Sequence, residues 1–211
     1  TVQNAIEKLE QEKKREETLS SLQQQLEEQL PRLRERFVRS LLTGYFSTRE
    51  RAKLELDYFH IENENLSHIC FVIQMDDAAP LPDDLETAHL VQFGLCNITR
   101  DFIDRLGSGY VLISQQDQIV GVVSSPKSPE ALARQALSIS HGIRTMVKRV
   151  LDQTITIGVG NPCGDLLDIS LSFNQARQAL INRNYFGNGG IYTVETARDT
   201  EKPVACRNYD M

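Results

Sequence analysis

Apolar residues in the first 43 positions recur every three or four residues, the spacing that lines one side of an α-helix. Residues 1–30 contain no Gly or Pro and are rich in Glu, Gln, Lys and Leu, which favour helix. Pro31 predicts a kink or a restart, because proline is tolerated in a first turn and disfavoured in a helix interior. We expect residues 1–43 to form a helical linker that pairs two chains as a coiled coil, with an exposed single helix as the alternative. The candidate seam residues are Leu19, Leu22, Leu26, Leu30, Leu33 and Phe37.

Residues 44–66 are expected to form a short helical connector. Gly44 is placed to end the preceding helix near Thr43, since glycine readily adopts the left-handed conformation of a helix end. Ser47 and Glu50 have the S-x-x-E spacing of a capping box, in which the two side chains bond free N–H groups at a helix start. We therefore predict a short helix that begins at Ser47 and ends near Tyr58.

The pattern changes at residue 67, where β-branched and other apolar residues begin to run together. Gly107 and Gly109 are expected to end the first helix of this region, and Ser128 with Pro129 to start the second. Strands joined through helices on one face of a mixed sheet make an α+β domain, which we place at residues 67–196. Residues 197–211 have no clear periodicity and are expected to be a linker. The predicted elements are strand 69–75, helix 84–106, a hairpin of 110–113 and 119–123, helix 129–151, strand 154–160, helix 169–182 and strand 191–194.

The composition of the chain argues against several classes of protein. The chain has 211 residues with 29 acidic and 23 basic side chains, and its net charge of -6 argues against direct nucleic-acid binding. The sequence has no apolar run long enough to cross a membrane, and its first residues are too charged for a signal peptide. Four widely spaced cysteines form no C-x-x-C pair, so we expect reduced thiols and a cytoplasmic location.

Two motifs, one acidic and one containing glycines, are candidates for a binding site. Asp76 and Asp77 follow a strand, where carboxylates are positioned to approach a cation. Gly158, Gly160 and Gly164 resemble a dinucleotide-binding loop, but their G-x-G-x-x-x-G spacing does not match that motif. Close packing of a helix on a strand explains these glycines instead.

The order of elements resembles the nucleotide-cyclase-like GGDEF fold. The resemblance rests on Asp76-Asp77 after the first strand, on the hairpin residues 115–120, and on the glycine-bearing strand 154–160. Active members of that family use two hairpin glycines to approach the nucleotide, and acidic residues to help hold a divalent metal. Here Gln115 and Gln116 stand at the glycine positions.

The second acidic position of the hairpin is also replaced, by Gln118. The resemblance therefore implies a degenerate, non-catalytic domain with no cofactor and no metal, in which Asp76, Asp77 and Asp117 would hold a cation only weakly. The candidate degenerate site consists of Asp76, Asp77, Gln115, Gln116, Asp117 and Gln118.

Residues 30–44 and 157–180 resemble the central region of YesN-type response regulators, a two-component class with a receiver and an AraC-type helix-turn-helix domain. This resemblance implies a signal-transmitting, dimerising region of a transcription regulator whose receiver and DNA-binding domains are absent from this sequence. A homodimer is then expected, with a sensor histidine kinase and DNA as partners of those other domains, and no membrane partner. A regulatory domain that senses a nucleotide or another small molecule is the alternative function.

Overall fold

The computed structural model describes residues 21, 27–46, 48–76, 85–105, 108–114 and 116–194. Its contacts divide the chain into two units, Thr1–Arg39 and Ser40–Met211. Within the described part of the chain, no helix is long and apolar enough to cross a membrane. The expected linker at residues 197–211 lies outside the described residues, as do Leu19, Leu22 and Leu26 of the candidate seam.

Residues 27–43 form one helix, and the chain is helical on both sides of Pro31. The restart expected at that proline is therefore not observed. Among the seam candidates described, Leu33 is 37% exposed whereas Phe37 is only 4% exposed. The helix ends at Gly44 as predicted: its φ is +70°, its N–H bonds to the Leu41 carbonyl, and the N–H of Tyr45 bonds to the Ser40 carbonyl.

Helix α2 (Arg49–Tyr58) follows, and its start differs by one residue from the prediction. Thr48 is the N-cap, and its side-chain oxygen accepts a hydrogen bond from the backbone N–H of Arg51 at 3.1 Å. The N-cap is thus Thr48, one position after the predicted Ser47, which lies outside the described residues. The end at Tyr58 is confirmed.

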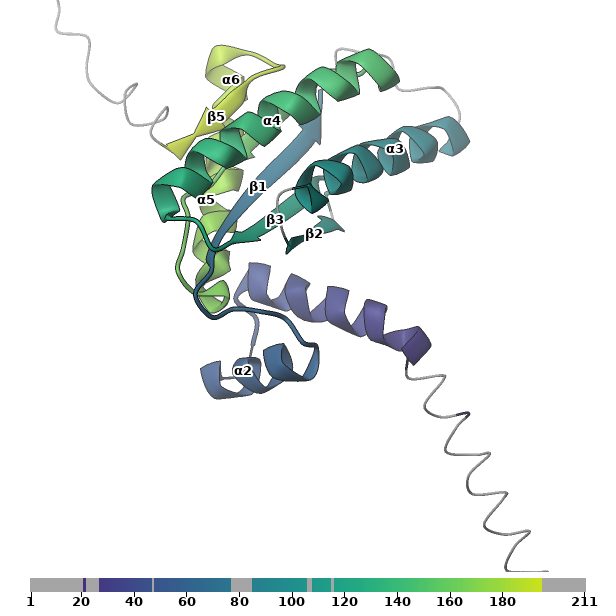
Figure 1. Ribbon diagram of the computed structural model, residues 1–211. Helices are drawn as coiled ribbons and strands as arrows, with labels where there is room; N and C mark the ends of the chain where they lie inside the picture. The colour runs from purple at the N-terminus through teal and green to yellow at the C-terminus, as the bar shows by residue number, and fades with distance from the viewer. Residues whose placement is uncertain are drawn as a thin grey trace, which may run out of the picture. The chain divides into compact units, whose positions relative to one another are not determined.

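The described strands form one five-stranded sheet in the order β2-β3-β1-β4-β5 (Figure 1). Central strand β1 pairs antiparallel with β3 on one side and with β4 on the other. Strands β2 and β3 form the predicted hairpin, with Ile113 opposite Ile119, while β5 lies parallel to β4. The bounds are β1 (Ser67–Met75), β2 (Ser108–Ile113), β3 (Ile119–Ser125), β4 (Ile155–Val159) and β5 (Ile191–Thr193).

The helices cover both faces of this sheet, which corrects the expectation of a single covered face. Figure 1 shows α3 (Leu85–Asp104) and α4 (Pro129–Leu151) on one face and α5 (Ile169–Ile181) on the other. A short 3-10 helix η1 (Leu166–Asp168) precedes α5, and α6 (Arg183–Phe186) follows it. Side chains alternate between the faces of a strand, so each strand of the sheet centre contributes to both layers.

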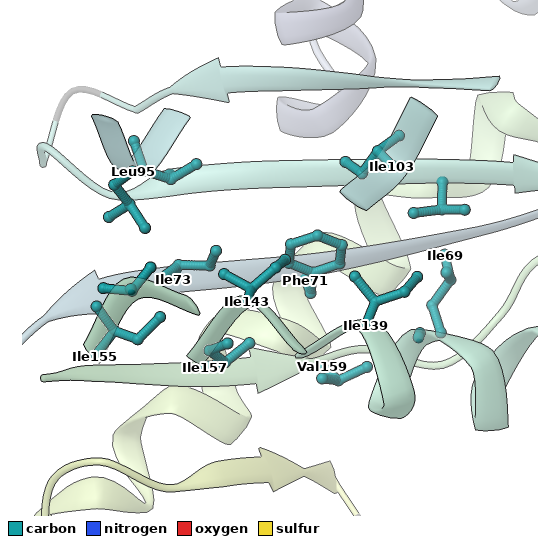
Figure 2. Packing of buried hydrophobic residues seen from close by; sticks show 14 of the residues in the cluster. Ile69, Phe71, Ile73, Leu95, Ile103, Ile139, Ile143, Ile155, Ile157 and Val159 are labelled. Carbon is teal, nitrogen blue, oxygen red and sulfur yellow. The ribbon is translucent and has the colours of Figure 1, made fainter. Parts of the chain in front are cut away.

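The core lies between β1, β4 and the pair α3–α4 (Figure 2). Alternate residues of β1 are fully buried there against α4. This arrangement confirms the predicted α+β architecture. The labelled side chains of the core are Ile69, Phe71, Ile73, Leu95, Ile103, Ile139, Ile143, Ile155, Ile157 and Val159.

One predicted helix end is wrong. Gly109 lies inside β2, because pairing with β3 already begins at Ser108 opposite Ser124. Gly107 lies outside the described residues, and α3 ends at Asp104. The start of α4 is as predicted, with the Ser128 side chain accepting a hydrogen bond from the N–H of Ala131.

Candidate functional site

The tip of the β2–β3 hairpin is organised by Ser114. Its N–H donates to the Gln118 carbonyl at 2.8 Å, and its hydroxyl oxygen accepts from the backbone N–H groups of Gln116 and Gln118. Asp117 is exposed and has a positive φ of 56°, as a tight turn requires. Gln115 and Asp77, two of the residues in the candidate site, lie outside the described residues.

Gln118 turns away from the exposed hairpin tip and faces Gln74 on the neighbouring strand β1. Its Nε2 donates to the Gln74 Oε1 at 2.9 Å, and the residue is only 9% exposed. Gln118 Oε1 is buried and has no hydrogen-bond partner among the described residues. The hairpin thus buries an amide where active family members are expected to carry an acid.

The carboxylate of Asp76 is buried and has a structural role, because it bonds groups from two other segments. It is 3% exposed, and one carboxylate oxygen accepts from Thr156 Oγ1 at 2.7 Å while the other accepts from the Gly189 N–H at 2.9 Å. Its own N–H donates to the Thr154 carbonyl at 2.9 Å. These bonds tie the end of β1 to the start of β4 and to the turn before β5.

The described residues do not fit a divalent-metal site. Both oxygens of Asp76 already serve internal donors, and Gln74 and Gln118 are neutral. Within the described ranges, no group of three or more His, Cys, Asp or Glu is placed to hold a metal ion. Magnesium prefers several anionic or carbonyl oxygens, and this arrangement supplies no free carboxylate pair.

A pocket of about 340 Å³ lies beside the two glutamines. The C-terminal half of α5 and the start of α6 form its other side. Arg177 reaches toward the hairpin tip, where its Nη2 lies 3.3 Å from the Gln116 Oε1. The pocket is lined by Gln74, Gln118, Asn174, Arg177, Gln178, Leu180, Ile181, Arg183 and Asn184.

Gly158 in β4 and Gly160 just after it have a packing role, which confirms for these two glycines, and not for Gly164, the interpretation preferred over a dinucleotide loop. A Cβ atom at Gly158 would lie 2.0 Å from the Ala176 carbonyl oxygen, and one at Gly160 would lie 2.0 Å from that of Ser172. A Cβ at Gly164 would meet nothing within 4 Å. Gly158 and Gly160 therefore let α5 lie directly on the strand.

Comparison with protein families gives a match to the GGDEF-like domain over residues 49–180. The chain belongs to the GGDEF-like domain family. This confirms the resemblance inferred from Asp76, the hairpin and the strand at residues 154–160. No curated protein gives a significant match. The match includes α2, which the sequence analysis assigned to a connector.

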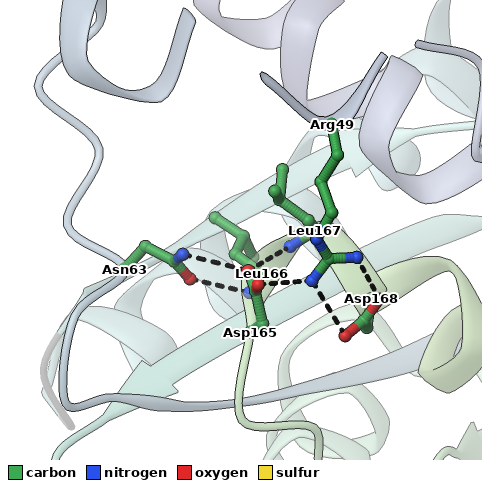
Figure 3. Close-up of polar contacts among 6 residues, drawn as sticks. All are labelled: Arg49, Asn63, Asp165, Leu166, Leu167 and Asp168. Atoms are coloured by element: carbon green, nitrogen blue, oxygen red, sulfur yellow. Dashed lines mark hydrogen bonds and ion pairs between the residues drawn. The ribbon is translucent and has the colours of Figure 1, made fainter. Parts of the chain in front are cut away.

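A second polar cluster joins α2 of the GGDEF-like domain to the segment before α5 (Figure 3). The Arg49 guanidinium bonds both oxygens of Asp168, at 2.8 and 3.2 Å, and also pairs with Asp165. Asn63 completes the cluster: its Nδ2 donates to Asp165 Oδ1 at 3.0 Å, and its Oδ1 accepts from the Leu166 N–H at 2.7 Å. We call Arg49, Asn63, Asp165 and Asp168 the α2 latch.

The charges of the α2 latch stabilise one another. Burial raises the pKa of Asp165, but hydrogen bonds from the Leu167 N–H, Asn63 and Arg49 outweigh it, so the pKa of that carboxyl is lowered. Bonds to Asp168 and then Asp165 raise the pKa of Arg49. No local motif predicts this cluster, because the pair Arg49 and Asn63 lies more than 100 positions from the pair Asp165 and Asp168.

His68 and Cys163 lie beside the latch and pair through their backbones, with two N–H···O bonds of 2.8 Å. His68 is fully buried, and its Nδ1 lies 2.8 Å from Ser124 Oγ. Burial lowers the pKa of His68, which keeps the ring neutral. Burial likewise raises the pKa of Cys163 to about 11, so its thiol is a poor nucleophile.

Proposed function

We propose that this chain is a non-catalytic, signal-transmitting and dimerising region of a two-component response regulator that controls transcription through an AraC-type domain. The observation that carries the proposal is the α2 latch, which ties a helix preceding the sheet to the start of α5. A sensor histidine kinase and DNA would be partners of other domains of that regulator. The GGDEF-like domain itself would respond to a movement of the helix that precedes it.

The segment that would transmit a movement from the N-terminal helix to α2 is short. The helix over residues 27–43 ends at Gly44, and only four residues, 45–48, separate that glycine from α2. A shift of the helix end would therefore reach Arg49 directly. Because the planar guanidinium engages Asp168 through two bonds, a change in the direction of α2 would alter both at once.

The lack of catalysis is part of the proposal. Phosphoryl transfer relies on metal ions to neutralise developing charge, and the described residues supply no fitting site. Gln118 and Gln74 bond each other instead. Incubation with GTP and Mg²⁺ should give no cyclic dinucleotide, measured by chromatography, and a product that disappears in Asp76→Asn would contradict this part.

Chain pairing can be measured by sedimentation equilibrium of the whole chain beside the double variant Leu22→Lys/Leu26→Lys. We expect a dimer that becomes a monomer in the variant, because like charges would face each other across the seam. A matched control is Leu54→Lys/Leu90→Lys, since both leucines are exposed, at 62% and 61%. A dimer that survives the seam substitutions would place the interface in the GGDEF-like domain.

Sensing of a small molecule is the second candidate function, and the pocket beside Gln74 and Gln118 favours it. Calorimetric titration of the whole chain with GTP, cyclic dinucleotides and Mg²⁺ tests the nucleotide form of this function. Heat from a nucleotide would support nucleotide sensing. The absence of heat for all three would exclude it and leave other small molecules.

A further inference from the structure

The turn between α6 and β5 contains the dipeptide Asn188-Gly189 (Figure 1). Asn188 is exposed, and among the described contacts none holds its side chain. Gly189 has a φ of +77°, a left-handed conformation that glycine adopts without strain. Because glycine has no Cβ, its backbone nitrogen is unhindered and can approach the side-chain amide carbon of the preceding asparagine. The dipeptide is therefore chemically suited to deamidation, in which asparagine loses its amide nitrogen as ammonia.

The folded chain restrains the nitrogen that would react. The Gly189 N–H donates to Asp76 Oδ2 at 2.9 Å and to Thr156 Oγ1 at 3.0 Å. The carbonyl oxygen of the same glycine accepts from Arg144 Nη1 at 2.8 Å. Asp76 is only 3% exposed, so the N–H is directed at a buried carboxylate. These bonds fix the peptide groups on both sides of the Gly189 Cα, and the nitrogen cannot turn toward Asn188 Cγ while they hold.

Other bonds hold the two ends of the turn. Tyr192 Oη donates to the Gly187 carbonyl at 2.7 Å, and the Gly190 carbonyl accepts from the Ile157 N–H at 3.0 Å. The turn is therefore attached to β4 and β5 by contacts that do not involve Asp76. Loss of the Asp76 bond would free the Gly189 N–H by a local opening, without unfolding of the sheet.

We propose that Asn188 is a deamidation site that the hydrogen bonds of Gly189 keep unreactive until the turn opens locally. In the reaction, the Gly189 nitrogen forms a bond with Asn188 Cγ, and the bond from that carbon to the side-chain amide nitrogen breaks. Ammonia leaves with the proton released by the Gly189 N–H, and a cyclic succinimide remains. Water then opens the ring at either carbonyl and gives aspartate or isoaspartate.

The product would change the Met75 end of β1. Both products carry a new carboxylate in the turn that Asp76 holds, and isoaspartate also lengthens the main chain by a methylene group. A longer main chain would not keep both the Gly189 bond to Asp76 and the Gly190 bond to Ile157. Deamidation would thus loosen β5 from β4 irreversibly. This modification is separate from the signal-transmitting function, and neither depends on the other.

Peptide mapping of the whole chain after incubation at mildly alkaline pH tests the proposal. Deamidation raises the mass of the peptide that contains Asn188, and chromatography separates isoaspartate from aspartate. We expect the wild-type chain to react at least about tenfold more slowly in buffer than in guanidinium chloride that unfolds it, because the bonded N–H is released only by opening. Equal rates in the two conditions would overturn the proposal, as would the absence of reaction in the unfolded chain.

The variant Asp76→Ala locates the restraint. It should accelerate deamidation of Asn188 in buffer about tenfold, because the Gly189 N–H loses its charged acceptor. The matched control is Ser172→Ala, which removes a buried acceptor of the Cys70 N–H in another part of β1 and should leave the rate as in wild type. An unchanged rate in Asp76→Ala would contradict the proposal. A slower rate would also contradict it, since the carboxylate would then assist the reaction.

A second variant, Arg144→Gln, tests the same restraint from the carbonyl side of Gly189. Arg144 is only partly buried, and its loss frees the Gly189 carbonyl without leaving a buried charge. We expect a severalfold faster reaction. If circular dichroism shows that Asp76→Ala does not fold, an unchanged rate in Arg144→Gln overturns the proposal. Asn188→Gln should abolish the mass change, which identifies the residue that reacts.

Discussion

The two ends of β1 use polar side chains in different ways. At the Ser67 end, His68 lies in bonding distance of Ser124 and pairs through its backbone with Cys163, next to the α2 latch. At the Met75 end, Asp76 is fully bonded, but the neighbouring Gln74–Gln118 pair leaves one buried oxygen without a described partner. Polar bonds at the first end hold distant segments together, whereas the glutamine pair at the second end leaves one buried acceptor without a described partner.

Helix α5 connects these two ends. It begins at Ile169, directly after the latch residue Asp168, and its last turns line the pocket. Its position on the sheet depends on the close approach of its backbone to Gly158 and Gly160. Helix α5 therefore contacts residues at both ends of β1.

The largest expected effect comes from Gly158→Ala, which tests whether α5 supports both ends. The new Cβ would lie 2.0 Å from the backbone oxygen of Ala176, so the helix must move, at a cost of about 3 kcal/mol in the free energy of unfolding. Urea denaturation measures this loss. Gly164→Ala is the control, because nothing lies within 4 Å of its Cβ. Equal stability of the two variants would show that the close packing is unimportant.

Asp76→Ala should affect only the Met75 end. The substitution leaves the Thr156 hydroxyl and the Gly189 N–H without their acceptor, which costs about 2 kcal/mol in the free energy of unfolding. Asp76→Asn, which keeps one carbonyl acceptor, should recover part of this loss. Urea denaturation gives the magnitude, and hydrogen exchange of the α2 amides should remain unchanged. Faster exchange in α2 would mean that the two ends are not separate.

Lowering the pH should reduce the stability of the fold mainly through His68, at the Ser67 end of β1. Burial lowers the pKa of His68 in the folded state despite opposing effects of the Asn63 backbone and of Asp165, so the unfolded chain takes up the proton more readily. The stability contributed by the neutral ring is full above the ordinary pKa of about 6.5 and is lost as pH falls through the lower folded value. Urea denaturation across this range in His68→Gln should show a weaker pH dependence than wild type.

The control for that measurement is His141→Asn, since His141 is exposed on α4. It should leave the pH dependence as in wild type. A steep dependence that persists in His68→Gln would assign the effect to another group, such as Asp165, whose lowered pKa acts in a more acidic range.

The smallest expected effect is that of Arg49→Gln, which opens the latch. Exposed ion pairs contribute little to global stability, so urea denaturation should barely change. Local opening is more sensitive: amide exchange in α2 should accelerate severalfold, while exchange in β3 stays constant. Arg51→Gln is the matched control, since Arg51 pairs only with Glu55 on the same helix among the described contacts. Equal exchange in both variants would argue against coupling through the latch.

Much of the fold could be predicted from local pattern. The hairpin, the Ser128 start of α4, the Gly44 helix end and the order of strands and helices all follow from periodicity and turn chemistry, which act over a few residues. Apart from the expectation of a single covered face, two of the errors are also local. Thr48 rather than Ser47 caps α2, and Gly109 belongs to a strand, because neighbouring residues compete for such positions and tertiary pairing selects one.

The sequence by itself determined that the hairpin carries Gln116 and Gln118 in place of the family residues, and that Gly158 and Gly160 are suited to close packing. Only the tertiary structure decided what the polar groups do. Asp76 bonds Gly189 across 113 positions and Arg49 bonds Asp168 across 119. Such contacts depend on how the sheet and α5 bring distant segments together. Short-range spacing in the chain carries no information about them, since hydrogen bonds act over only a few ångströms.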